Sequence, residues 1–77
     1  MTEGRIYFDD KSQAVDVVGA PCVGMLYFNV YWLEVDEYGD LQEHLRYSTN
    51  YMTPEEARDL GNLFRKVADE VDPEGAK

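Results

Sequence analysis

The 77-residue chain has few basic residues, one cysteine and one histidine. Seven lysines and arginines stand against sixteen acidic residues, which gives a net charge of −9. An acidic chain without a basic stripe repels the phosphates of nucleic acids, so we exclude direct binding to DNA or RNA. The single cysteine excludes an intramolecular disulfide, and Cys22 with His44 gives too few ligands for a zinc site. We therefore expect no cofactor and no metal.

The sequence also lacks a long apolar run. The longest weakly charged stretch, residues 17–33, is interrupted by Gly19, Pro21, Gly24 and Asn29, and it is too short to span a bilayer as a helix. The first residues, MTEGRIYF, do not have the basic and apolar segments of a signal peptide. We therefore predict a cytoplasmic protein with no membrane partner, located in the host cytoplasm if a phage encodes it.

The length allows one domain, predicted over residues 1–77 with an ordered part at about 5–72 and flexible ends at 1–4 and 73–77. An apolar share of 44% and an aromatic share of 13% exclude a disordered chain. A domain of this size buries about 60% of its unfolded surface, and its core contributes about 3–5 kcal/mol. Because no disulfide or metal strengthens that core, we predict a homodimer.

Four segments, residues 5–9, 13–18, 23–35 and 41–51, have the alternation or the β-branched and aromatic content of strands. Turn-forming residues separate them at 10–12, 19–22 and 36–40. One face of the resulting antiparallel sheet is apolar and is the expected core. Its members are Ile6, Phe8, Val15, Val17, Leu26, Phe28, Val30, Trp32, Leu41 and Leu45.

A helix is predicted after the fourth strand. Thr53 is a good N-cap, Pro54 suits the first helical position, and Glu56 completes a capping box. Apolar residues then recur at spacings of three and four, which predicts an amphipathic helix that ends before Pro73. This apolar stripe consists of Ala57, Leu60, Phe64, Val67 and Val71. We predict an α+β fold of order β-β-β-β-α, in which the helix packs on one face of the four-stranded sheet.

One helix leaves the second face of the sheet open. The alternation places Tyr7, Tyr27, Asn29, Tyr31, Leu33, His44 and Arg46 on that face. Tyrosine and arginine are frequent in binding hot spots, so we predict that Tyr7, Tyr27, Tyr31 and Arg46 contact a partner. Three interpretations stay open: ordinary strand residues with solvated hydroxyls, a homodimer contact, or a contact with a different protein.

Five acidic residues gather around the third turn, at Glu34, Asp36, Glu37, Asp40 and Glu43. As a functional surface, this cluster would dock on the basic surface of a partner. As a solvated hairpin tip, it would keep the sheet edge from aggregating. The spacing does not match a calcium-binding loop.

No residue pattern indicates catalysis. Cys22 and His44 lie on different predicted elements, and neither is part of a nucleophile motif. We expect Cys22, beside Pro21, to be a half-buried apolar residue and His44 to lie on the open sheet face. An enzyme would need a pocket between subunits, which is the least supported hypothesis for so small a chain.

The segment MTPEEARDLGNLFRKVADEVD, residues 52–72, resembles the C-terminal helix of a class of small uncharacterised proteins of actinobacteria and their phages. The shared positions are Thr53, Pro54, Glu55, Glu56, Ala57, Arg58, Leu60, Ala68, Asp69 and Glu70. The match covers about a quarter of the chain. The resemblance implies a β-rich domain closed by one helix and a phage or bacterial source, and it carries over no functional residues.

We therefore predict a small non-enzymatic protein-interaction module. With a phage source, it would be an effector that binds and modulates a host protein. The alternative is an acidic mimic of nucleic acid that blocks the basic cleft of a host nucleic-acid-binding or defence protein.

Overall fold

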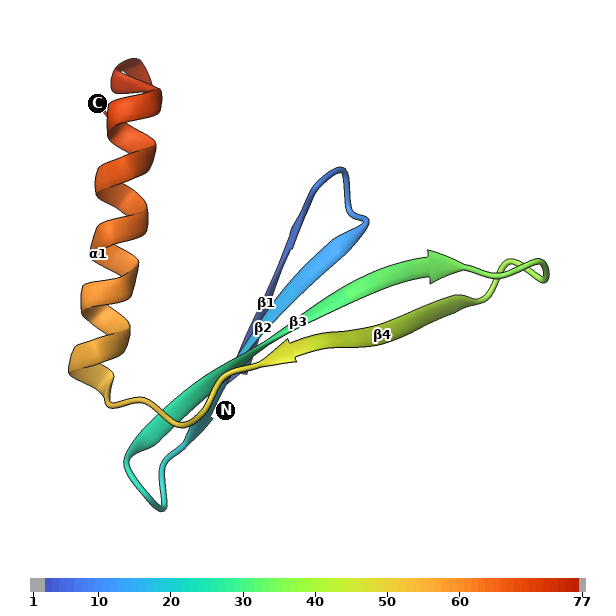
Figure 1. Ribbon diagram of the computed structural model, residues 1–77, viewed down its shortest axis with the longest axis horizontal. Helices are drawn as coiled ribbons and strands as arrows, with labels where there is room; N and C mark the ends of the chain where they lie inside the picture. Colours follow the sequence, from blue (N-terminus) through green and yellow to red (C-terminus); the bar gives the residue numbers. More distant parts are fainter. Residues whose placement is uncertain (1–2, 77) are drawn as a thin grey trace.

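The computed structural model describes residues 3–76, so Met1, Thr2 and Lys77 of the predicted flexible ends lie outside the described residues. Four strands precede one long helix and a short 3₁₀ turn (Figure 1). The elements are β1 (Glu3–Phe8), β2 (Gln13–Ala20), β3 (Met25–Val35), β4 (Leu41–Ser48), α1 (Pro54–Val71) and the 3₁₀ turn Pro73–Ala76.

The strands form one antiparallel sheet in the order β1-β2-β3-β4, which confirms the predicted α+β class and strand order. Every strand pairs with its neighbour in sequence, as short connections favour. β3 begins two residues later than predicted because the amides of Val23 and Gly24 donate to the carbonyls of Ala20 and Pro21, which makes residues 20–24 a turn.

Two of the turns are held by an aspartate side chain. In the β1–β2 turn, Asp9, Asp10 and Lys11 all have positive φ, and the Asp9 carboxylate accepts from Ser12 Oγ and Gln13 Nε2. In the β3–β4 turn, Asp36 Oδ1 accepts from the amides of residues 38 and 40, each at 2.9 Å. Aspartate tolerates left-handed backbone better than most residues and stabilises turns in this way.

The strand register assigns each side chain to a face, because paired residues point the same way. The apolar face carries Ile6, Phe8, Val15, Val17, Leu26, Phe28, Val30, Trp32 and Tyr47, and one end of it carries the polar residues Gln13, Glu34, Gln42 and His44. The tyrosine face carries Arg5, Tyr7, Ala14, Asp16, Tyr27, Asn29, Tyr31, Leu33, Leu41, Glu43 and Leu45.

A β-bulge changes the predicted faces of β4. Val30 pairs with Tyr47, but Tyr31 pairs with Leu45, so Arg46 is the extra residue of the bulge. An extra residue shifts the alternation by one on one side of the bulge. Our assignment of Leu41 and Leu45 to the apolar face is therefore wrong, since both lie on the tyrosine face. His44 pairs with Trp32 and lies on the apolar face, opposite to the prediction.

The helix begins as its sequence predicts. The Glu56 amide donates to Thr53 Oγ1 at 3.1 Å, and the Thr53 amide donates to Glu56 Oε1 at 2.9 Å. This reciprocal pair is a capping box, and Pro54 occupies the first turn, where no amide hydrogen is needed. The helix runs to Val71, where the Asp72 amide caps the carbonyl of Ala68.

The helix does not cover the sheet, which corrects the predicted packing. Within the described residues, α1 approaches only β3 among the strands, and none of its residues is buried. Ala57 and Leu60 in the first two turns are half-buried, and the rest of the helix stands clear of the sheet (Figure 1). Most of the helix stripe and the apolar face are thus both without a covering layer over residues 3–76.

The connection between β4 and α1 explains the position of the helix. After β4, the Thr49 amide donates to the Phe28 carbonyl, and Leu26 and Met52 exchange two backbone hydrogen bonds of 3.0 and 2.8 Å. Residue 52 is therefore fixed along β3, and only Thr53 separates it from the helix. Connections that reverse the chain usually need several residues. The helix therefore starts one residue after this bridge and leaves the sheet from that point.

Candidate interaction surfaces

The apolar face is uncovered over most of its extent within the described chain. Ile6 is 71% exposed and Trp32 is 51% exposed, while Phe28 and Val30 at its centre are half-buried. Our prediction that these residues form a buried core is therefore wrong. The buried residues of the described chain are Ala14 and Leu33, which both lie on the tyrosine face. Large exposed apolar patches occur at protein or membrane interaction sites and at ligand grooves, so this face is a candidate interaction surface.

The stripe on α1 is a second exposed apolar surface. Phe64 is 70% exposed, and Leu63, Val67 and Val71 are exposed as well. Arginine, lysine and acidic residues occupy the opposite side, so the helix is amphipathic. Most of its apolar side packs against no other element of the described chain. A helix of this composition gains little stability from propensity alone and depends on packing of its apolar stripe.

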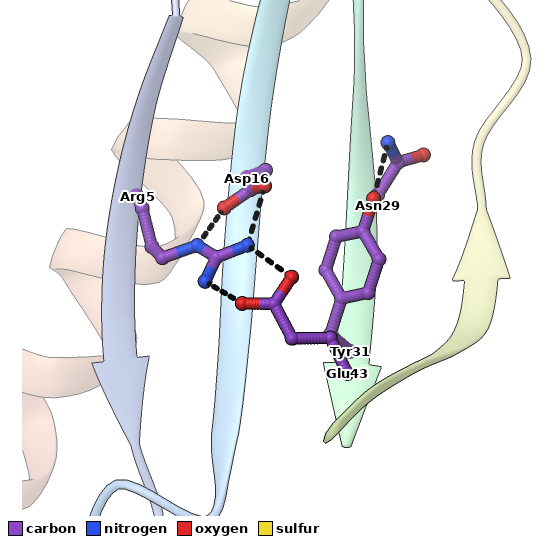
Figure 2. Close-up of polar contacts among 5 residues, drawn as sticks. All are labelled: Arg5, Asp16, Asn29, Tyr31 and Glu43. Carbon is purple, nitrogen blue, oxygen red and sulfur yellow. Dashed lines mark hydrogen bonds and ion pairs between the residues drawn. The ribbon is translucent and has the colours of Figure 1, made fainter. Parts of the chain in front are cut away.

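The tyrosine face is covered in part by one arginine. Arg5, on the edge strand β1, reaches across the sheet to Asp16 of β2 and Glu43 of β4 (Figure 2). Its Nη2 donates to Asp16 Oδ2 at 2.9 Å, and its Nη1 donates to Glu43 Oε1 at 2.6 Å. The guanidinium also lies 5.7 and 5.5 Å from the ring centroids of Tyr7 and Tyr31, within cation–π range.

This cluster, Arg5 with Asp16, Glu43, Tyr7 and Tyr31, is the Arg5 clasp. Hydrogen bonding to Asp16 and then to Glu43 raises the pKa of the Arg5 guanidinium. The same bonds from Arg5 hold the pKa of Asp16 and of Glu43 below their usual ranges. The side chains of Arg5 and Asp16 are each 24% exposed, so water screens the pair only in part. The clasp joins both edge strands of the sheet through side chains.

The four residues predicted to contact a partner do not form one patch. Tyr7 and Tyr31 lie together in the Arg5 clasp, and the Tyr31 hydroxyl accepts from Asn29 Nδ2 at 3.4 Å (Figure 2). Tyr27 lies near the helix connection, where its ring and that of Tyr51 form an edge-to-face pair with centroids 5.4 Å apart. Arg46 is the bulge residue of β4 and is exposed. Their role as partner contacts stays a prediction.

Three of the five residues in the acidic cluster, Glu34, Asp36 and Glu43, contact other groups of the chain. Hydrogen bonds from the backbone amide of Asp40, and then from Tyr38, lower the pKa of the Asp36 carboxyl. Glu43 pairs with Arg5, and Glu34 Oε2 lies 3.3 Å from His44 Nε2. Glu37 and Asp40 are exposed at the tip of the β3–β4 hairpin. The cluster therefore organises a turn and two cross-strand contacts.

The remaining candidate residues lie apart. Cys22 is exposed in the β2–β3 turn, not half-buried as predicted, because residues 20–24 project beyond the sheet. Over residues 3–76, no group of three or more metal-ligating side chains is arranged around an ion site. In the same part of the chain, no helix has the length and apolar character needed to cross a membrane.

Sequence reasoning missed the importance of Arg5 and of the apolar face. The signal for the Arg5–Asp16 pair was present, because the turn at residues 9–12 sets two oppositely charged residues across from each other. The reach of Arg5 to Glu43 depends on the register shift at the bulge, which no local pattern indicated. The course of α1 away from the apolar face follows the Leu26–Met52 bridge, which no local pattern indicated either.

Comparison of the chain with protein-family models, curated proteins and solved structures gave no match in any of the three. The resemblance of residues 52–72 to the C-terminal helix of small actinobacterial and phage proteins stays a prediction. The surfaces described above are therefore the basis for a functional proposal.

Proposed function

We propose that this chain is a non-enzymatic protein-interaction module that works by burying its apolar face and helix stripe against protein. The observation that carries the proposal is the bare apolar face, on which Ile6 and Trp32 are more than half exposed and which no other element covers within the described chain. Apolar surface of this kind gains about 25 cal/mol for each Å² removed from water.

The apolar face also supplies the residue types that dominate protein contacts. Trp32 and Tyr47 lie on it, with Phe8 and Phe28 beside them. Large aromatic side chains are the most frequent anchors of protein–protein interfaces. The acidic alternative has less support, because Asp36 holds a turn and Glu43 is paired with Arg5.

The test is capture of binding proteins by the immobilised chain, with variants that place a charge on either face. Ile6→Glu puts a carboxylate on the apolar face, and Tyr7→Glu puts the same charge on the tyrosine face of the same strand. We expect Ile6→Glu to abolish capture, including capture of a second copy of the chain, while Tyr7→Glu retains it. Equal capture by both variants, or loss with Tyr7→Glu alone, would refute the apolar face as the contact surface.

A further inference from the structure

We propose that the partner on the apolar face is a second copy of this chain, and that the two copies exchange helices, so that α1 of each packs on the apolar face of the other. This inference rests on the proposed function and names its partner. The two surfaces that it joins, the helix stripe and the apolar face, are both apolar and both left uncovered over the described residues.

The accessible surface of the chain has the size that such an exchange requires. A compact monomer of 8.9 kDa exposes about 4800 Å², whereas this chain exposes 6316 Å². The excess is about 1500 Å² per chain, or about 3000 Å² for a pair, which falls in the range of obligate homodimers. The radius of gyration of 15.1 Å likewise exceeds the value of about 11.5 Å for a compact chain of this length.

The dimensions of the two surfaces match. The 18 residues of α1 extend about 27 Å, and the 11 residues of β3 extend about 36 Å. A helix about 10 Å across covers most of the width of a sheet whose four strands are spaced about 4.8 Å apart. One helix therefore covers the central part of the apolar face.

The connection before α1 favours exchange over closure within one chain. With residue 52 fixed along β3 and only Thr53 before the helix, α1 leaves the sheet on a course set by the backbone. Short connections of this kind are a known cause of domain swapping. A two-fold exchange also closes on itself, because each copy gives one helix and receives one.

Light scattering after size exclusion tests the second copy. We expect a mass of about twice 8.9 kDa at micromolar concentration. Phe64→Glu in the helix stripe and Ile6→Glu on the apolar face should each weaken the association constant at least about tenfold. Asn62→Glu, on the polar side of the helix, and Leu41→Glu, at an exposed position of the tyrosine face outside the Arg5 clasp, carry the same charge and should leave the mass unchanged. A mass of one chain for the unmodified protein would overturn the inference.

Cysteine cross-linking tests the exchange itself. In a Cys22→Ser background, Phe64→Cys and Val17→Cys are combined, so that a disulfide joins the helix stripe to the apolar face. We expect a covalent dimer on a non-reducing gel, and no cross-link when Asn62→Cys replaces Phe64→Cys. A cross-link within one chain would show closure over its own sheet, and a dimer without cross-link would show another contact, such as β4 edge pairing. Either result overturns the exchange.

The two proposals fail in different ways. If the chain is a monomer yet a protein of different sequence is captured through Ile6, the helix exchange is wrong and the interaction module stands. If the unmodified chain captures neither itself nor another protein, both proposals are wrong.

Discussion

Among the described residues, the Arg5 side chain contacts more other side chains than any other does: Asp16, Glu43, Tyr7 and Tyr31. It lies on an edge strand, yet it binds acidic residues of β2 and β4 and covers two tyrosine rings. Edge strands have only one neighbour and are the first to separate from a sheet. The Arg5 clasp therefore holds β1 in place through side chains where its backbone has a single partner.

Replacing Arg5 with methionine should lower the free energy of unfolding by about 1–2 kcal/mol, since it removes a bidentate charge pair and leaves the Asp16 carboxylate partly buried without a partner. Denaturant unfolding at one fixed protein concentration measures the change. Arg65→Met on the exposed side of α1 is the matched control and should shift stability by less than about 0.5 kcal/mol. Equal effects of the two variants would show that the Arg5 clasp contributes nothing.

Stability should fall in acid. Asp16, Asp36, Glu43 and Glu56 all have pKa values below their unfolded values of 3.8 for aspartate and 4.5 for glutamate. As the pH falls, the unfolded chain therefore takes up protons first. The stabilisation is complete above the unfolded pKa values and is lost progressively from about pH 5 downward.

Unfolding measured between pH 3 and pH 7 checks this dependence. Arg5→Met should reduce it, because Arg5 causes the lowered pKa of Asp16 and Glu43. Asp36 and Glu56, which bind backbone amides, should keep their part of the pH dependence in that variant. An unchanged acid slope in Arg5→Met would contradict the assignment.

At the scale of the elements, the strands and the helix follow local rules that can be read from the chain. The capping box at Thr53, the alternation in β3 and the turn residues at 36–40 all predicted the observed elements. The faces of β4 could not be predicted, because the bulge at Arg46 reverses the alternation without a local signal. The course of the helix could not be predicted either, because it depends on the pairing of Leu26 with Met52.

Removing the cap should weaken the helix. Thr53→Ala deletes the hydroxyl that accepts from the Glu56 amide and should cost about 1 kcal/mol, whereas Thr53→Ser keeps the oxygen and most of the stability. Circular dichroism during thermal unfolding reports both variants. If alanine and serine behave alike, the capping box does not stabilise α1.

At the scale of the whole molecule, net charge and exposed apolar area act in opposite directions on the affinity between two copies of the chain. Each chain carries a net charge of −9, so two copies repel each other at long range while their apolar surfaces attract on contact. The extents of 42 × 39 × 20 Å describe an open shape rather than a closed one. We therefore expect added salt to strengthen the association of two copies, because it screens the repulsion between them.

Raising sodium chloride from about 50 mM to about 500 mM should strengthen the dimer, because salt screens repulsion between like charges and leaves apolar contact intact. Sedimentation equilibrium at both concentrations measures the dissociation constant. Binding by an acidic nucleic-acid mimic to a basic cleft would weaken under the same change. A dimer that dissociates at high salt would show that the contact is electrostatic.

The single residue between the Leu26–Met52 bridge and α1 also has a kinetic consequence. The four strands pair in sequence order and can assemble within one chain in a unimolecular step. In the proposed helix exchange, burial of the helix waits for a collision with a second chain and is therefore a second-order step. Refolding after dilution from denaturant should therefore show a phase whose rate rises in proportion to chain concentration, following a faster phase that does not change.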